Sequence, residues 1–154
     1  MKIELATLED AERLWEVQKA AFYEYIEKYG HFEDNPYDMT FDRIKFNINY
    51  HLGKYYKIIK DDQIIGGVFG FLLDRDDMMK IAQFYLLPDY QAQHLGEEAL
   101  KYVLDIHQEI KVWVVDTIYQ ETLNIHFYEK LGFEIVDVEA VDEDLSFATL
   151  IYKR

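Results

Sequence analysis

Hydrophobic and polar positions follow two different periods along this chain of 154 residues. Between positions 11 and 30, apolar and aromatic residues recur at helical spacing, which predicts a long helix that ends at Gly30. A second amphipathic stretch predicts a helix from Thr40 to about Leu52, after a loop that contains Pro36. Two further helical patterns cover positions 94–107 and 122–131.

The remaining patterned segments have the alternation of strands. They lie at positions 2–6, 54–60, 63–73, 78–87, 133–139 and 145–152, and a nearly continuous apolar run at 111–115 is typical of a central strand. This order of elements predicts an α/β (α+β) fold, with a mixed, mostly antiparallel twisted sheet of about seven strands and helices on both faces. The length fits a single domain over positions 1–154.

Charge and cysteine content narrow the classes of partner. The 30 acidic and 16 basic residues give a net charge of -14, which disfavours nucleic acid and weakly favours a cationic substrate, although the same surplus can serve solubility alone. The absence of cysteine excludes disulfides and a cysteine nucleophile and indicates a cytoplasmic location. No apolar stretch has the length of a membrane span, and the scattered histidines predict no metal site.

The most informative segment joins the end of an apolar strand to the start of a helix. It reads Leu86-Leu87-Pro88, then, after two residues, Gln91-Ala92-Gln93-His94-Leu95-Gly96-Glu97. Helix N-termini present unpaired backbone N–H groups and the positive end of the helix dipole. Such a turn can bind a phosphate or pyrophosphate without any basic side chain, although the pattern alone is weak evidence.

A second segment, Phe127-Tyr128-Glu129-Lys130-Leu131-Gly132-Phe133, follows about thirty residues later. Together the two segments resemble the coenzyme-binding and C-terminal signatures of the GNAT superfamily of N-acetyltransferases, and the order of elements resembles that fold. The resemblance implies that the loop from Gln91 to Glu97 holds the pyrophosphate of acetyl-CoA. It also implies that main-chain N–H near Leu86 and Leu87 stabilises the developing oxyanion, and that Tyr128 protonates the departing thiolate.

The chain departs from the family pattern at several positions. His94 stands where the first glycine of the loop is usual; it either adds positive charge beside the pyrophosphate or is exposed without a role. Glu121 and Asn124 replace the usual asparagine and alanine before Phe127, and Asn124 together with Phe127 is expected beside the pantetheine arm. Tyr128 has packing as its alternative role.

The reaction implied by the resemblance is transfer of an acetyl group from acetyl-CoA to a primary amine, by direct attack in a ternary complex. Forming the free amine requires a base, but the strand segment 81–85 contains no carboxylate. The groups reachable in principle also suit ordinary polar roles, so the base is left unassigned; they are Glu24, Asp116 and His126.

The acceptor is expected to be a small-molecule or peptide amine, with a cation favoured. The first two helices and their loop are expected to receive it, although aromatic helix stripes are usually core; the residues are Tyr23, Tyr25, Tyr29, His31, Glu33 and Asp34. The main alternative is a catalytically silent acyl-CoA-binding sensor or interaction module of the same fold. A longer acyl group, a purely structural role and a homodimer formed through the two closing strands also remain open.

Overall fold

A seven-stranded sheet forms the centre of the computed structural model, which describes residues 1–154. The strands are β1 (Lys2–Leu5), β2 (Gly53–Lys60), β3 (Gln63–Leu72), β4 (Met78–Leu86), β5 (Val112–Ile118), β6 (Glu134–Ala140) and β7 (Ser146–Lys153). Their order across the sheet is β1-β2-β3-β4-β5-β7-β6. All neighbours are antiparallel except β4 and β5.

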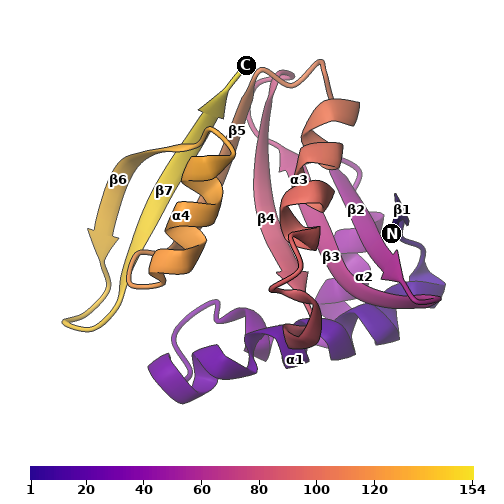
Figure 1. Cartoon of the computed structure of the whole chain (residues 1–154), viewed down its shortest axis with the longest axis horizontal. Helices are drawn as coiled ribbons and strands as arrows, with labels where there is room; N and C mark the ends of the chain where they lie inside the picture. The colour runs from indigo at the N-terminus through magenta and orange to yellow at the C-terminus, as the bar shows by residue number, and fades with distance from the viewer.

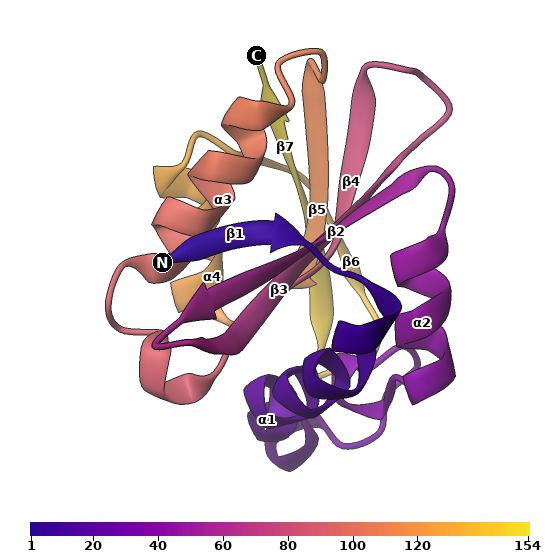
Figure 2. The ribbon, with the colours of Figure 1, turned by 90° about the vertical axis from the view of Figure 1, so that its right-hand side faces the viewer.

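Four α-helices cover the two faces of this sheet, as Figures 1 and 2 show. The pair α1 (Ala11–Tyr29) and α2 (Phe41–Asn49) lies on one side, and the pair α3 (Leu95–Ile106) and α4 (Thr122–Lys130) on the other. Gly30 ends α1 with a positive φ of 68°, which glycine adopts without steric cost. The Thr40 hydroxyl caps α2 by accepting the Arg43 N–H at 3.1 Å.

Each helix pair encloses its own hydrophobic core. Under α3 and α4, fully buried side chains such as Leu100 pack with Ile58 and Trp113 of the sheet. Under α1 and α2, Leu14 and Ile44 pack in a second cluster that contains three aromatic side chains of the sheet, Tyr55, Phe69 and Tyr85. The predicted fold class, with its mostly antiparallel sheet and helices on both faces, is therefore confirmed.

The parallel pair β4 and β5 separates toward its carboxyl end. Pairing joins Met78–Ile81 to Val112–Val115 and stops there, although β4 continues to Leu86 and β5 to Ile118. A bulge at Ala82, which has no partner in the β3–β4 register, lies directly after the last paired residue. We call this place the β4–β5 divergence. Figure 1 shows the N-terminal ends of α3 and α4 at the same end of the molecule, beside α1.

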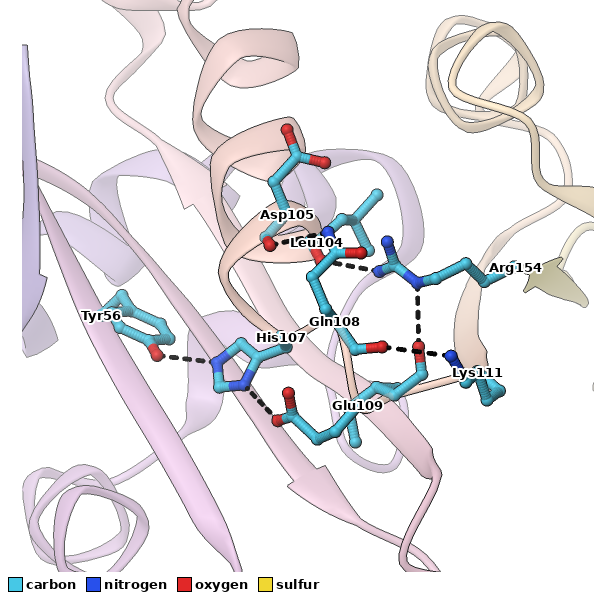
Figure 3. Close-up of polar contacts among 9 residues, drawn as sticks. Tyr56, Leu104, Asp105, His107, Gln108, Glu109, Lys111 and Arg154 are labelled. Atoms are coloured by element: carbon cyan, nitrogen blue, oxygen red, sulfur yellow. Dashed lines mark hydrogen bonds and ion pairs between the residues drawn. The ribbon is translucent and has the colours of Figure 1, made fainter.

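The C-terminal end of α3 is held in place by a network of polar contacts, drawn in Figure 3. The buried His107 ring lies 2.7 Å from the Tyr56 hydroxyl through Nε2 and 3.1 Å from the Glu109 carboxylate through Nδ1. Arg154 donates to the carbonyl of Leu104 at 2.7 Å, which binds the C-terminus of the chain to the last turn of α3. The end of α3 away from the β4–β5 divergence is therefore fixed by specific polar contacts.

Candidate active site

The loop before α3 presents a run of unpaired backbone N–H groups. From Ala92 to Glu97, no N–H donates a hydrogen bond within the protein, and the first N–H that does is Glu98, which bonds the His94 carbonyl at 3.2 Å. Leu95, Gly96 and Glu97 form the first turn of α3, where intrahelical partners are absent by geometry. The run fits a pyrophosphate because the positive end of the helix dipole adds to these donors.

His94 takes the backbone conformation that the missing glycine would supply. Its φ of 60° and ψ of 10° lie in the left-handed region, directly before Leu95 at the start of α3. The side chain is 85% exposed, and Nδ1 lies 4.0 Å from the Glu97 carboxylate. A left-handed residue next to right-handed ones turns successive N–H groups toward one concave point. The side chain thus leaves the loop geometry intact.

Two glutamines of the loop bond within it. Gln91 donates its side-chain amide to the Leu86 carbonyl at 2.9 Å, and Gln93 donates to the Asp89 carbonyl at 3.1 Å. The Ala92 side chain is exposed, whereas that of Leu95 is buried in the core. Gln91 therefore anchors the loop to the end of β4, and Leu95 contributes to a ligand site only through its backbone.

Leu86 and Leu87, at the end of β4, differ in whether their backbone N–H is already hydrogen-bonded. The Leu87 N–H donates to the Ile65 carbonyl of β3 at 2.8 Å, so it is not free, and the expectation that it stabilises an oxyanion is corrected. Because backbone groups alternate along a strand, Leu86 faces the other side, where β4 has no neighbour beyond Ile81. Of the two leucines, Leu86 is therefore the one whose N–H has no strand partner at the β4–β5 divergence.

Gly96 lies against a pair of aromatic rings from two different elements. Phe84 of β4 stacks on Phe127 of α4, with ring centroids 5.6 Å apart. A Cβ on Gly96 would lie 3.4 Å from Phe84 and from Leu86, and 3.6 Å from Phe127. The start of α3 thus packs on this pair, with room for a Cβ at ordinary contact distance and not for a larger side chain.

Tyr128 of α4 is buried beside these rings, with 7% of its surface exposed. Its ring makes edge contacts with Phe127 and Phe133 at centroid distances of 5.2 and 5.5 Å. Burial raises the pKa of the Tyr128 phenol well above its usual range, and the nearby Tyr25 phenol raises it further. No protein group hydrogen-bonds the Tyr128 hydroxyl, and this oxygen is not among the fully buried polar atoms without a partner, so it is an accessible donor that a ligand can use.

One face of α4 contacts the C-terminal half of α1. Asn124 donates its side-chain amide to the Tyr25 hydroxyl at 2.8 Å. Glu121, which precedes α4, accepts from the Tyr29 hydroxyl at 2.5 Å and from the Lys28 ammonium at 3.2 Å. Asn124 is therefore directed at α1 through its amide nitrogen. Glu121 and Asn124 were noted in the sequence as departures from the family pattern, but that pattern did not predict their α1 partners.

Glu97 joins α3 to α4 near the loop. It accepts from Lys101 at 3.0 Å and from Lys130 at 3.1 Å, and it lies in the first turn of α3. Hydrogen bonds from Lys101 and then Lys130 lower the pKa of the Glu97 carboxyl. The two ammonium groups offset a negative charge that would otherwise oppose a phosphate at this helix end.

The structure does not bring the three candidate bases together with Tyr128. The Glu24 carboxylate is 65% exposed and bonds Lys28, and Asp116 lies 2.9 Å from Lys80. His126 is exposed on α4. The base therefore stays unassigned.

Of the residues expected to receive the acceptor, Tyr25 accepts a hydrogen bond from Asn124 of α4, and Tyr29 donates one to Glu121, which precedes α4. Tyr23 packs edge-on against Tyr37, and the His31 ring lies 2.8 Å from the Asp38 carboxylate. The remaining two are exposed loop carboxylates, Glu33 and Asp34.

An open hollow of about 770 Å³ lies elsewhere on the molecule, beside α2, and its walls include Phe46, Tyr50 and His51. None of its lining residues belongs to the loop before α3 or to α4. No group of three or more histidine, aspartate or glutamate side chains is arranged to hold a metal ion. None of the helices combines the length and apolar character that crossing a membrane requires.

Comparison with known proteins finds a relative in sequence. YrkN of Bacillus subtilis (strain 168) is 30% identical over 122 residues, a match that covers 79% of this chain and 65% of YrkN. The chain therefore spans less than two thirds of the length of that relative.

Several solved structures share the fold. The ribosomal-protein-S18-alanine N-acetyltransferase of Escherichia coli superposes with a TM-score of 0.80 at 14% identity, covering 99% of this chain and 92% of that one. The PaiA N-acetyltransferase of Thermoplasma acidophilum, solved with coenzyme A, gives 0.77 at 19% identity over 100% of both chains. At these identities the likeness establishes the fold alone.

A family model supplies the stronger evidence. The model described as the acetyltransferase (GNAT) family matches residues 11–133, which include the loop before α3 and the whole of α4. The fold that contains the seven-stranded sheet and the β4–β5 divergence superposes on that of an N-acetyltransferase over 99% of this chain. The chain belongs to the GNAT family of acetyltransferases.

Proposed function

We propose that this protein transfers an acetyl group from acetyl-CoA to a primary amine, by direct attack in a ternary complex. The observation that carries the proposal is a pairing of two features at one end of the sheet. The unpaired N–H groups from Ala92 to Glu97 suit a pyrophosphate, and the unpartnered hydroxyl of the mostly buried Tyr128 suits a leaving thiolate. Membership of the family supports acyl transfer from acetyl-CoA in general.

The loop and the aromatic pair have distinct roles in this proposal. Backbone N–H groups of the loop bind the pyrophosphate, and Gln91 keeps the loop in place through the Leu86 carbonyl. The free edge of β4 and the Phe84–Phe127 pair line the path of the pantetheine arm toward Tyr128. Bound acetyl-CoA supplies the activated acetyl thioester.

The chain's own groups then act on the reacting atoms. The amine nitrogen forms a bond to the acetyl carbon while the bond from that carbon to sulfur breaks. The Leu86 N–H offers a hydrogen bond to the carbonyl oxygen as negative charge develops on it. Tyr128 holds its proton because burial raises its pKa, and the thiolate released in the same apolar surroundings is also made more basic. Proton transfer from Tyr128 to sulfur follows, and the proton that the nitrogen loses as the amide forms returns through solvent to the Tyr128 phenolate.

The acceptor is proposed to be a small-molecule or peptide amine, with a cation favoured by the net charge of -14. Structures of the same fold include the S18-alanine N-acetyltransferase and a spermidine N-acetyltransferase chimera of Vibrio cholerae and hSSAT, with a TM-score of 0.76 at 13% identity over 99% of this chain and 94% of that one. The names of these neighbours cover both protein and small-molecule amines. The single domain, the cytoplasmic location and a homodimer through β6 and β7 stay predictions.

A catalytically silent acyl-CoA-binding module is the second candidate. It is favoured by the absence of a carboxylate on β4, which leaves the amine without an assigned base. Such a module would bind acetyl-CoA through the same loop but would release no thiol with any amine.

Two measurements on the wild-type protein separate the candidates. Calorimetry measures acetyl-CoA binding, and a thiol assay with mass spectrometry of the products follows acetyl transfer to a panel of amines. Binding with amine-dependent thiol release and an acetylated amine supports the enzyme. Binding without release on a broad panel supports the silent module. Absence of binding contradicts both.

A further inference from the structure

One face of α4 presents a carboxylate, an amide and a phenol toward α1. They belong to Glu121, Asn124 and Tyr128, whose spacing of three and then four residues places them on one side of a helix. Glu121 and Asn124 bond side chains of α1, and the Tyr25 phenol lies close enough to Tyr128 to influence its ionisation. The row spans about 10 Å along the helix axis.

Glu121 does not use its carboxylate to cap its own helix. Its side chain makes no hydrogen bond to the first turn of α4, and its oxygens bond α1 instead, with only 16% of the side chain exposed. Tyr29 donates to it at 2.5 Å, and the ring of Tyr29 makes an edge contact with that of Tyr25 at 5.9 Å. A carboxylate flanked by aromatic rings is a good environment for an ammonium group.

An ammonium group already occupies this environment. Lys28 bonds Glu121 at 3.2 Å, and it also bonds Glu24 of its own helix at 2.5 Å, while its side chain is 44% exposed. If another cation displaced Lys28 from Glu121, Lys28 would keep Glu24 as its partner and would remain partly solvated. The exchange therefore leaves no charge unpaired, which keeps its cost small.

We propose that Glu121 binds a second ammonium group of the acceptor, and that Lys28 holds its place until the acceptor arrives. This inference rests on the proposed function, because it takes the reactive amine to lie near Tyr128 and the second cation about 10 Å away along α4. The acceptor class is then a diamine or a longer polycationic amine. Tyr29 orients Glu121, and the hydrogen-bonded pair of Tyr25 and Asn124 lies between the two ends.

A matched pair of acceptors tests this assignment. Diaminooctane carries two ammonium groups at about this separation, and aminooctanol replaces one of them by a neutral hydroxyl. The kcat/KM for each is measured with the wild type, Glu121→Gln, Lys28→Met and Lys45→Met. Lys45 pairs with Asp42 on α2 and lies outside the candidate site, so Lys45→Met controls for the loss of one positive charge.

The wild type is expected to prefer diaminooctane. Glu121→Gln keeps an oxygen for the Tyr29 hydroxyl and should reduce this preference about tenfold, while turnover of aminooctanol changes little. Lys28→Met should increase the preference, and Lys45→Met should leave it unchanged. An equal rate for both acceptors in the wild type, an unchanged preference in Glu121→Gln, or a lower one in Lys28→Met overturns the proposal.

Binding separates this inference from the proposed function. Calorimetry of diaminooctane with the protein in the presence of coenzyme A needs no turnover. Weaker binding in Glu121→Gln and tighter binding in Lys28→Met support the cation site even if no amine is acetylated, a result that would count against the enzyme alone. Binding that is the same in all four proteins overturns the cation site. The melting temperature of each variant shows whether a change in binding or turnover results from a loss of stability.

Discussion

Phe84 of β4 stacks on Phe127 of α4 at the place where β4 loses its neighbour β5, with ring centroids 5.6 Å apart and an interplanar angle of 27°. The contact joins the strand that leads into the loop before α3 to the helix that carries Tyr128. The loop proposed to bind the pyrophosphate and the helix that carries Tyr128 therefore both adjoin this aromatic pair. The packing of Gly96 on the same pair gives the first prediction.

Gly96 should tolerate alanine but not a larger side chain. The added Cβ would lie 3.4 Å from its nearest neighbours, which is ordinary van der Waals contact, so Gly96→Ala should change the free energy of unfolding by less than about 1 kcal/mol. Gly96→Leu forces Phe84 and Phe127 apart and should cost about 1–3 kcal/mol. Denaturant unfolding of both variants checks the difference; equal stability would contradict the packing.

Substitutions at His94 separate the effect of its backbone conformation from the effect of its side chain. Because His94 has a φ of 60°, His94→Gly should stay within about 1 kcal/mol of the wild type in stability, whereas His94→Val should lose about 1–2 kcal/mol. Calorimetry of acetyl-CoA with His94→Gly and with the wild type tests the side chain: weaker binding in the variant shows that the imidazole contributes to the pyrophosphate site. Unchanged or tighter binding would show that the side chain has no such role.

The helices, strands and their order were predictable because each element has a local pattern. The predicted helix at 11–30 corresponds to α1, and Gly30 ends it as expected. Two boundaries differ for reasons that lie beyond the local pattern. The extended backbone of Tyr50 ends α2 before the predicted Leu52, and β5 continues past Val115 because Asp116 and Thr117 pair with β7.

The candidate site was predictable only where a motif lies in one segment. The loop from Gln91 to Glu97 and the left-handed conformation at position 94 follow from a helix start and from the glycine usual there. The Tyr29–Glu121 bond joins residues 92 positions apart, and the Phe84–Phe127 contact joins a strand to a later helix. Such contacts arise when segments that are distant in sequence pack together, so no local sequence pattern predicts them.

Several tyrosines should resist ionisation in the folded protein. Burial is the largest cause that raises the pKa of each phenol in this set: Tyr25, Tyr29, Tyr55, Tyr56, Tyr85 and Tyr128. Ultraviolet titration above about pH 10 should therefore ionise only part of the 13 tyrosines until the protein unfolds.

The same tyrosines predict how the stability of the protein changes at alkaline pH. Their folded pKa values are raised, so their contribution is fully present below the ordinary value of about 10 and declines as the pH rises above it. The unfolded chain releases protons that the folded chain keeps, and the free energy of unfolding should fall with pH in that window. Chemical denaturation at a series of alkaline pH values measures the slope; a rise in stability would contradict the assignment.

The Tyr56–His107 bond should matter for stability and not for coenzyme binding. His107→Ala leaves the buried Tyr56 hydroxyl without its partner at 2.7 Å, and Tyr56→Phe leaves the buried His107 Nε2 without it, so each variant should cost about 1–3 kcal/mol. Both variants should keep the wild-type affinity for acetyl-CoA, since the network lies at the other end of α3 from the loop. A large loss of affinity in Tyr56→Phe would contradict this separation.

The measurement that tests the central claim most directly is a comparison of the wild type with Tyr128→Phe, using calorimetry for acetyl-CoA binding and amine-dependent thiol release for turnover. We predict nearly equal affinities, because the phenylalanine ring keeps the contacts with Phe127 and Phe133, and a kcat lower by about a hundredfold or more, because the proton donor is lost. Equal kcat values in the two proteins would contradict the role of Tyr128, and the absence of amine-dependent thiol release in the wild type would contradict the proposed activity itself.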